Sequence, residues 1–285
     1  MRLNSSRISK AGTQVLDAGQ NSSFLARHEF LIRRLHSLTG LVPVGAYMVV
    51  HLLVNASVLD GPGTFQRLVY QIHSLGVVLW VVEWALIFLP LIFHAVLGVV
   101  IIRGGLSNSG TYAHASNIRY TLQRASGMIA LLFIAWHVFH MHGWFHAQWW
   151  REGVVEPLGG ARFNPYNAAS SAADALQGSV VVMILYVVGV LACVFHLANG
   201  LWAMGITWGV WTTPAAQRRA SGVCAAGGVI LAAVGLSSLA GMGTLDIDQA
   251  KQIEKRMEQA ARVTSGEVTP DEHKQLEVKD KSQGE

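Results

Sequence analysis

Long apolar segments alternate with shorter polar ones along most of the chain. A helix needs about 20 consecutive apolar residues to cross the hydrocarbon core of a bilayer. Five segments meet this length, and we expect membrane-spanning helices over about 36–59, 77–102, 121–145, 177–206 and 222–245. The pattern therefore predicts an all-α, membrane-spanning five-helix bundle.

Polar sequence lies at both ends of this bundle. Residues 1–32 contain no apolar core of the kind that a secretory signal needs, so we interpret them as a polar arm. The membrane domain is expected over 33–245. In the polar tail, 246–285, the spacing of Ile253 and Met257 allows a short surface helix, followed by a solvated or disordered end.

The distribution of arginine predicts the orientation in the membrane, because loops rich in Lys and Arg stay on the cytoplasmic side. The arginines gather before the first span, between spans two and three, and between spans four and five: Arg27, Arg33, Arg34, Arg103, Arg119, Arg124, Arg218 and Arg219. We therefore expect a multi-pass protein of the inner (cytoplasmic) membrane with a cytoplasmic N-terminus. Five spans then place the C-terminus outside.

Composition narrows the functional classes. The 285-residue chain is 52% hydrophobic and only 13% charged, which is typical of a membrane protein rather than a soluble one. Its net charge of +4 is modest and no basic stripe with interleaved aromatics occurs, which argues against a nucleic-acid partner. Two cysteines, Cys193 and Cys224, lie in apolar runs, and no C-x-x-C-H motif is present for covalent haem attachment.

Each of the first four spans carries one deeply placed histidine. An ionisable side chain at such depth is costly and normally faces the bundle interior, where it has a partner. With a rise of about 1.5 Å per residue, His51 and His137 lie roughly 22–24 Å from the cytoplasmic ends of their spans. His94 and His196 lie roughly 25–28 Å from the outer ends of theirs. The histidines thus form an outer pair and an inner pair.

Facing imidazoles at matched depth suit two haem irons, each held by two histidines from facing helices. We predict that His51 and His137 ligate an outer haem iron, and His94 and His196 an inner one. Zinc would need its ligands at a single depth. A hydrogen-bonded core histidine explains one such residue but poorly explains four. A proton relay is the stronger alternative, although Glu83 is nearly alone as an acidic residue within the spans.

Four stretches carry a resemblance to a known family: FLIRRLHSLTGLVPVGAYMVVHLLVN, FLPLIFHAVLG, LQRASGMIALLFIAWHVF and FHLANGLWAMGITWGV. Over about 28–243 the chain resembles the cytochrome b membrane-anchor subunit of succinate dehydrogenase and fumarate reductase, of the single-chain, five-helix, two-haem type. It departs from that pattern in a longer connection between spans three and four and in the tail after Asp246.

This resemblance implies the same pairing, His51 with His137 and His94 with His196, on two haem b groups. It also implies that flavoprotein and iron–sulfur subunits dock on the cytoplasmic side. Electrons would then pass between the iron–sulfur subunit and a membrane quinone, usually menaquinone. The chain itself would carry no flavin or dicarboxylate chemistry and no catalytic residue, so its share of the enzyme's reaction would be the quinone end.

Secondary candidates are cations and hydroxyls at the cytoplasmic ends of spans one and three that could hold haem propionates: Arg33, Arg34, His36, Ser37 and Arg124. The arginines could instead be membrane anchors or lipid contacts. Glu83 could exchange protons with a quinone near the outer haem, since a carboxylate can carry them. It could equally be a structural or interfacial residue.

Two other functions stay open on the sequence. One is the dihaem cytochrome b anchor of another respiratory dehydrogenase, such as a hydrogenase or formate dehydrogenase. The other, from a different class, is a haem-free multi-span transporter, since the equal spacing of the first three deep histidines could reflect an internal duplication.

Overall fold

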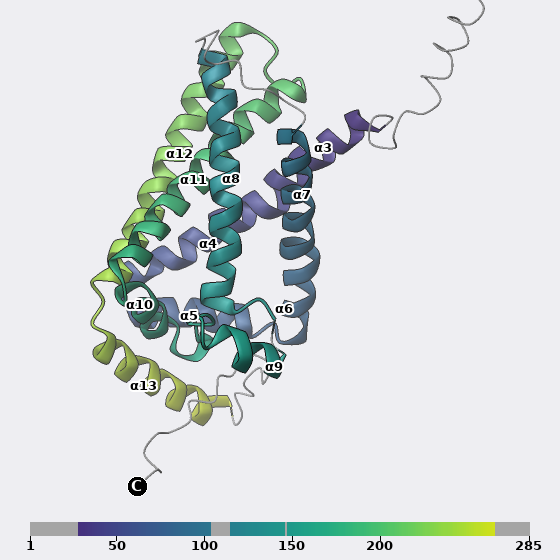
Figure 1. The fold of residues 1–285 in the computed structure, drawn as a ribbon. Coiled ribbons are helices and arrows are strands. Elements are labelled where there is room, and N and C mark those ends of the chain that lie inside the picture. The colour runs from purple at the N-terminus through teal and green to yellow at the C-terminus, as the bar shows by residue number, and fades with distance from the viewer. Residues whose placement is uncertain (1–27, 104–114, 146, 266–285) are drawn as a thin grey trace, which may run out of the picture.

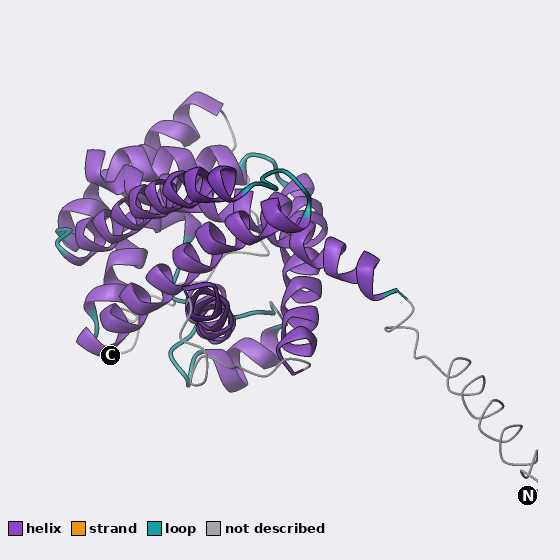
Figure 2. Cartoon of the chain, turned by 90° about the horizontal axis from the view of Figure 1, so that it is seen from above, coloured by secondary structure: helices purple, strands orange, loops and turns teal. Residues whose placement is uncertain are grey.

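The computed structural model describes residues 28–103, 115–145 and 147–265, and over these residues it contains helices and connecting turns only (Figures 1 and 2). Five of its helices are long and apolar enough to cross a membrane: Glu29–Asp60, Val77–Arg103, Asn117–His142, Val180–Thr207 and Pro214–Gly243. The predicted all-α bundle of five membrane helices is thus confirmed, and the chain is a multi-pass membrane protein.

Two spans contain short π-helical segments. The first span consists of α3 (Glu29–Thr39), η1 (Gly40–Gly45), α4 (Ala46–Ala56) and η2 (Ser57–Asp60). The second consists of α6 (Val77–Val82), η3 (Glu83–Phe88) and α7 (Leu89–Arg103). Pro43 lies inside η1, where it has no backbone N–H to donate. Such segments occur often at functional sites, and both precede a deep histidine here.

The remaining spans are continuous helices: α8 (Ala115–His142), α11 (Val180–Thr207) and α12 (Pro214–Gly243). α11 packs against both α8 and α12, and α4 packs against α12. α3 and α4 run obliquely past these helices, and α7 packs against α3 (Figure 1). Many large apolar side chains point outward, such as Val77 at 84% and Val180 at 77% exposure. Such a surface is suited to lipid, which replaces water as the solvent.

Local backbone features explain two of the differences between the helices and the expected spans. α12 begins at Pro214 rather than near 222, because the Thr213 hydroxyl accepts from the Ala216 N–H and Pro214 occupies the first turn. α8 ends at His142, because Gly143 and Trp144 adopt positive φ angles of 82° and 66°. The first span starts earlier than expected, at Glu29.

Three short helices pack together at one end of the bundle: α5 (Pro62–His73), α10 (Ala168–Gln177) and α13 (Ile247–Ser265). α10 lies in the long connection between spans three and four, and α13 is the surface helix expected in the tail (Figure 1). The polar arm up to residue 27 and the end of the tail from 266 lie outside the described residues.

Buried side chains from α5 and α13 cap the N-terminus of α10. Gln66 accepts from the Ala168 N–H, and Glu254 accepts from the Ala169 and Ser170 N–H groups. These N–H groups have no partner within their own helix, so the side chains satisfy them. Gln66 and Glu254 are both fully buried, and they join the three helices into one layer at this end of the bundle.

Candidate functional site

The four deep histidines meet in two pairs. His51 of α4 faces His137 of α8, with ring centroids 5.9 Å apart and an angle of 72° between the planes. His94 of α7 faces His196 of α11, with centroids 6.1 Å apart and planes at 81°. The structure therefore brings together the same two histidine pairs that were expected from depth. The two members of each pair come from different spans.

These separations leave room for one metal ion between the rings. A metal–imidazole bond is about 2 Å long, and the nitrogen lies roughly 1 Å from its ring centroid, so two imidazoles on one metal place their centroids ~6 Å apart. Crossed ring planes fit as well, because each ring can turn about the bond axis. Among the described residues no cluster of three or more His, Cys, Asp or Glu side chains could hold a metal, so the geometry offers two-histidine sites.

Hydrogen bonds orient three of the four imidazoles. Nδ1 of His94 lies 2.8 Å from the His36 carbonyl oxygen, and Nδ1 of His196 lies 3.1 Å from the Gln123 carbonyl oxygen. Nδ1 of His137 lies 3.2 Å from the Tyr186 hydroxyl. A histidine that ligates a metal typically donates its other N–H to such an oxygen, which leaves Nε2 for the metal.

Glycines on neighbouring helices make room for the inner pair. A Cβ atom at Gly40 would lie 2.2 Å from Cε1 of His94, and one at Gly127 would lie 2.8 Å from Cε1 of His196. Real Cβ atoms essentially never approach so closely, so a methyl group at either position would displace the histidine ring. In the sequence both glycines lie within apolar spans, among many others, and nothing there shows which ring each one faces.

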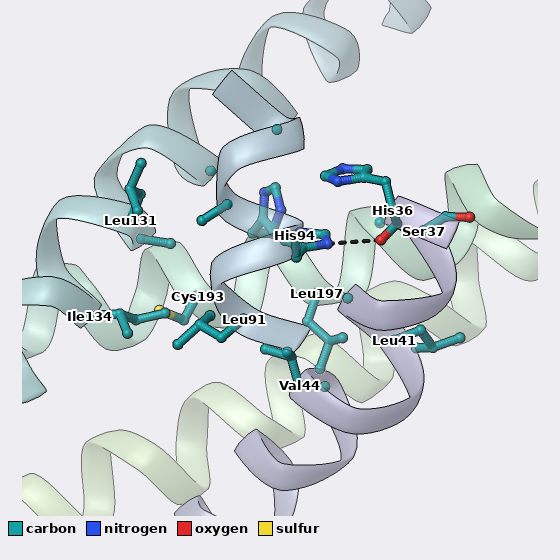
Figure 3. Close-up of a pocket in the computed structure, with 18 of the residues that line it drawn as sticks. His36, Ser37, Leu41, Val44, Leu91, His94, Leu131, Ile134, Cys193 and Leu197 are labelled. Atoms are coloured by element: carbon teal, nitrogen blue, oxygen red, sulfur yellow. Dashed lines mark hydrogen bonds between the residues drawn. The ribbon is translucent and has the colours of Figure 1, made fainter. Parts of the chain in front are cut away.

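A cavity of about 900 Å³ opens at the inner pair (Figure 3). Its wall is mainly apolar, with residues such as Leu41, Val44, Leu91, Leu131 and Ile134. All five propionate candidates from the sequence line it as well: Arg33, Arg34, His36, Ser37 and Arg124. A large apolar cavity with a few converging polar groups is the usual form of a cofactor site. His51, His137 and Glu83 do not line this cavity.

The polar groups along the cavity differ in how they are held. Arg33 forms an exposed ion pair with Glu29, at 2.7 Å. The Arg34 guanidinium lies over the ring of Trp208, whose N–H donates to the Ser37 hydroxyl.

Two further candidates face the same cavity. Arg124 donates to the Ile101 carbonyl oxygen. His36 is different, because its Nδ1 is buried and has no hydrogen-bond partner among the described residues. A buried nitrogen without a partner is uncommon, so Nδ1 of His36 is available to a polar group of a bound ligand.

Glu83 lies apart from these groups, at the first position of η3, and it is half-buried. The structure therefore groups the propionate candidates with the inner histidine pair but does not join Glu83 to them.

Sequence reasoning missed two groups of residues that contact the histidines. One comprises Tyr186 and His140, beside His137. The other is a polar chain in which Asn199 links Arg119 to Gln123, and Gln123 contacts His196. Isolated polar residues within apolar spans were the available signal, but their partners depend on how the helices are rotated.

Comparison with known proteins shows the family of the chain. No protein-family model matches the chain. The chain is, however, 36% identical over 211 residues to the succinate dehydrogenase cytochrome b558 subunit of Bacillus subtilis (strain 168). That alignment covers 74% of this chain and 96% of the relative. An identity of this level over nearly the whole relative, on a bundle of five membrane helices, shows that the chain belongs to the family of succinate dehydrogenase cytochrome b subunits.

Proposed function

We propose that this chain is the membrane-anchor and electron-transfer subunit of a succinate:quinone oxidoreductase and holds two haem b groups. The observation that carries the proposal is the pair of facing imidazoles, repeated at two depths of one bundle. The name of the Bacillus subtilis relative, a cytochrome b subunit, supports haem b as the cofactor.

In this proposal His51 and His137 ligate the iron of the outer haem, and His94 and His196 that of the inner one. Each haem supplies a one-electron redox centre when bound. The chain orients three of the four imidazoles through hydrogen bonds at Nδ1. The two histidines of each site come from two different spans, so the packing of these spans against each other determines the position of each metal site.

The inner site also offers partners for haem propionates. His36 has a buried Nδ1 without a partner, and Ser37, Arg33, Arg34 and Arg124 line the same cavity. An imidazole N–H, a hydroxyl and guanidinium groups are all suitable donors to carboxylates.

The proposal extends to sidedness and partners. The arginines that line the inner cavity lie at the end predicted to be cytoplasmic, with the N-terminus there and the C-terminus outside. The flavoprotein and iron–sulfur subunits would dock at this end. Electrons would pass through the inner and outer haems between the iron–sulfur subunit and a membrane quinone, with menaquinone the expected type. Glu83 remains a proposed proton carrier for that quinone.

Haem content and spectra of single variants test the proposal. The purified protein should contain two haems per chain, with a b-type band in the reduced-minus-oxidised spectrum. His94→Ala or His196→Ala should remove the inner haem and spare the outer one, and His51→Ala or His137→Ala should do the reverse. His73→Ala is a matched control, because His73 lies on α5 and contacts the Val69 carbonyl oxygen instead.

Fewer than two haems in the unaltered protein would contradict the proposal, as would two haems in any of the four variants. Subunits that purify with the chain provide a separate check. A flavin-bearing partner is expected, whereas a nickel or molybdenum protein would indicate another respiratory dehydrogenase. Absence of any haem would favour a transporter.

A further inference from the structure

Tyr186 lies between two histidines of α8. Its hydroxyl oxygen is 3.2 Å from Nδ1 of His137 and 2.9 Å from Nδ1 of His140, which follows one turn later. Tyr186 belongs to α11, so the contact joins two spans. The side chain is only 4% exposed, and apolar surroundings make such hydrogen bonds stronger than they are in water.

The donor and acceptor capacities of the three groups determine the direction of both hydrogen bonds. In the proposed function, on which this inference rests, Nε2 of His137 binds a metal. Nδ1 of His137 then carries a proton and can only donate, so the Tyr186 oxygen accepts from it. The hydroxyl proton of Tyr186 must therefore point elsewhere, and Nδ1 of His140 is the acceptor within reach.

Packing holds the His140 ring where its Nδ1 can accept the hydroxyl proton of Tyr186. Its ring is stacked on Trp136, with centroids 4.9 Å apart and 10° between the planes. Its side chain is 9% exposed, and its backbone carbonyl accepts from the Arg162 N–H. The acceptor of the Tyr186 proton is thus fixed by contacts on both its ring and its backbone.

The outer pair differs from the inner pair in this respect. His94 and His196 face backbone carbonyl oxygens at 2.8 and 3.1 Å, which no side-chain substitution removes. The Ser126 hydroxyl lies farther from Nδ1 of His196, at 3.5 Å. His137 depends on the hydroxyl of a side chain, so a single atom can be deleted to test the contact.

We propose that Tyr186, supported by His140, is a positioning residue that fixes the tautomer of His137 and strengthens this imidazole as a ligand of the outer haem. A hydrogen bond accepted from Nδ1–H makes the imidazole a stronger electron donor. A stronger donor favours ferric over ferrous iron and so lowers the reduction potential of the haem that it binds.

The test is a redox titration of the purified complex with Tyr186→Phe, which removes the hydroxyl and keeps the ring. We expect both haems to remain. The equilibrium between ferric and ferrous outer haem should shift about tenfold toward the ferrous form, which raises its reduction potential by roughly 59 mV. The inner haem should keep its potential. The ferric electron paramagnetic resonance signal of the outer haem should move as well.

Two further variants separate this role from a general packing effect. Tyr47→Phe removes a hydroxyl from a ring that lies against His51, the other outer histidine, with centroids 5.5 Å apart. It should leave the outer potential close to that of the unaltered protein. His140→Phe keeps an aromatic ring on Trp136 but removes the acceptor, and it should produce a smaller upward shift than Tyr186→Phe.

The outcomes distinguish this inference from the proposed function. An unchanged or lowered outer potential in Tyr186→Phe, with two haems present, would overturn the inference and leave the function standing. Absence of an outer haem from the unaltered protein would overturn the function itself. Should Tyr186→Phe lose its outer haem, the His140→Phe titration decides, and no upward shift there would refute the inference.

Discussion

The imidazole of His36 lies flat against that of His94, with ring centroids 4.0 Å apart and only 7° between the planes. The His36 carbonyl oxygen also accepts a hydrogen bond from Nδ1 of His94, shown as the dashed line in Figure 3. One residue of α3 therefore holds a proposed ligand through both its ring and its backbone. Its own buried Nδ1 is left to bind another group.

His36→Leu should weaken the inner haem site selectively. The substitution removes the proposed propionate donor at Nδ1 and the ring stack, whereas the carbonyl contact to His94 can persist. We expect the inner haem to be lost to a haem-scavenging protein about tenfold faster, which is typical when a residue that supports a metal ligand is removed. The loss rate of the outer haem should not change. His36→Gln, which restores an N–H donor, should recover part of the difference. Equal loss rates for His36→Leu and the unaltered protein would rule out the propionate contact.

Gly40→Ala should prevent formation of the inner site. The added Cβ atom would overlap the His94 ring, so this ring would have to leave the position from which it faces His196. Gly127→Ala should act in the same way through His196. We expect each variant to contain one haem per chain, measured by the pyridine haemochrome spectrum. Gly222→Ala is the matched control, because nothing lies within 4 Å of its Cβ position. Two haems in Gly40→Ala would show that the His94 ring is placed differently.

Asn199→Ala should destabilise the bundle around His196. Asn199 accepts from Arg119 Nε at 2.9 Å and donates to the Gln123 side chain at 2.8 Å. Its loss leaves two partly buried polar groups without this partner, which costs about 1–3 kcal/mol of unfolding free energy. Thermal unfolding in detergent, followed at the haem band and by circular dichroism, measures the effect. Ser221→Ala removes only the hydrogen bond from the Arg119 guanidinium to the Ser221 hydroxyl and should cost less unfolding free energy.

The attachment of α13 should depend on pH through Glu254. Burial raises the pKa of the Glu254 carboxyl above its ordinary value, although hydrogen bonds from Ser170 and Ala169 and the charge of Lys251 act in the opposite direction. In the undocked helix this pKa returns to about 4.3. At a pH between the undocked and the docked pKa of Glu254, the docked state therefore binds more protons than the undocked state. Docking weakens as pH rises through this range.

Hydrogen exchange of the α13 backbone amides, corrected for intrinsic rates, measures this docking. Protection should decrease from acidic to neutral pH in the unaltered protein and should show little pH dependence in Glu254→Gln. Glu254→Ala leaves the capped N–H groups of α10 without an acceptor and should lower the docking free energy by about 1–3 kcal/mol. A protection that increases with pH would contradict the assigned pKa direction.

The sequence alone was sufficient for the features that the bilayer imposes. Hydrocarbon thickness requires long apolar segments, so the five helices could be recognised from length and hydropathy. A constant rise per residue converts sequence position into depth. The depth of His51, His94, His137 and His196 therefore predicted which rings could meet.

The tertiary structure decided which neighbours surround those rings. The contacts of Gly40 with His94, of Tyr186 with His137 and of Glu254 with α10 all join segments that are distant in the sequence. Nearly uniform apolar spans carry little periodicity, so the sequence does not define how each helix is rotated about its axis. Rotation is set by the packing of one span against another, and only that packing brings the polar atoms to the imidazoles.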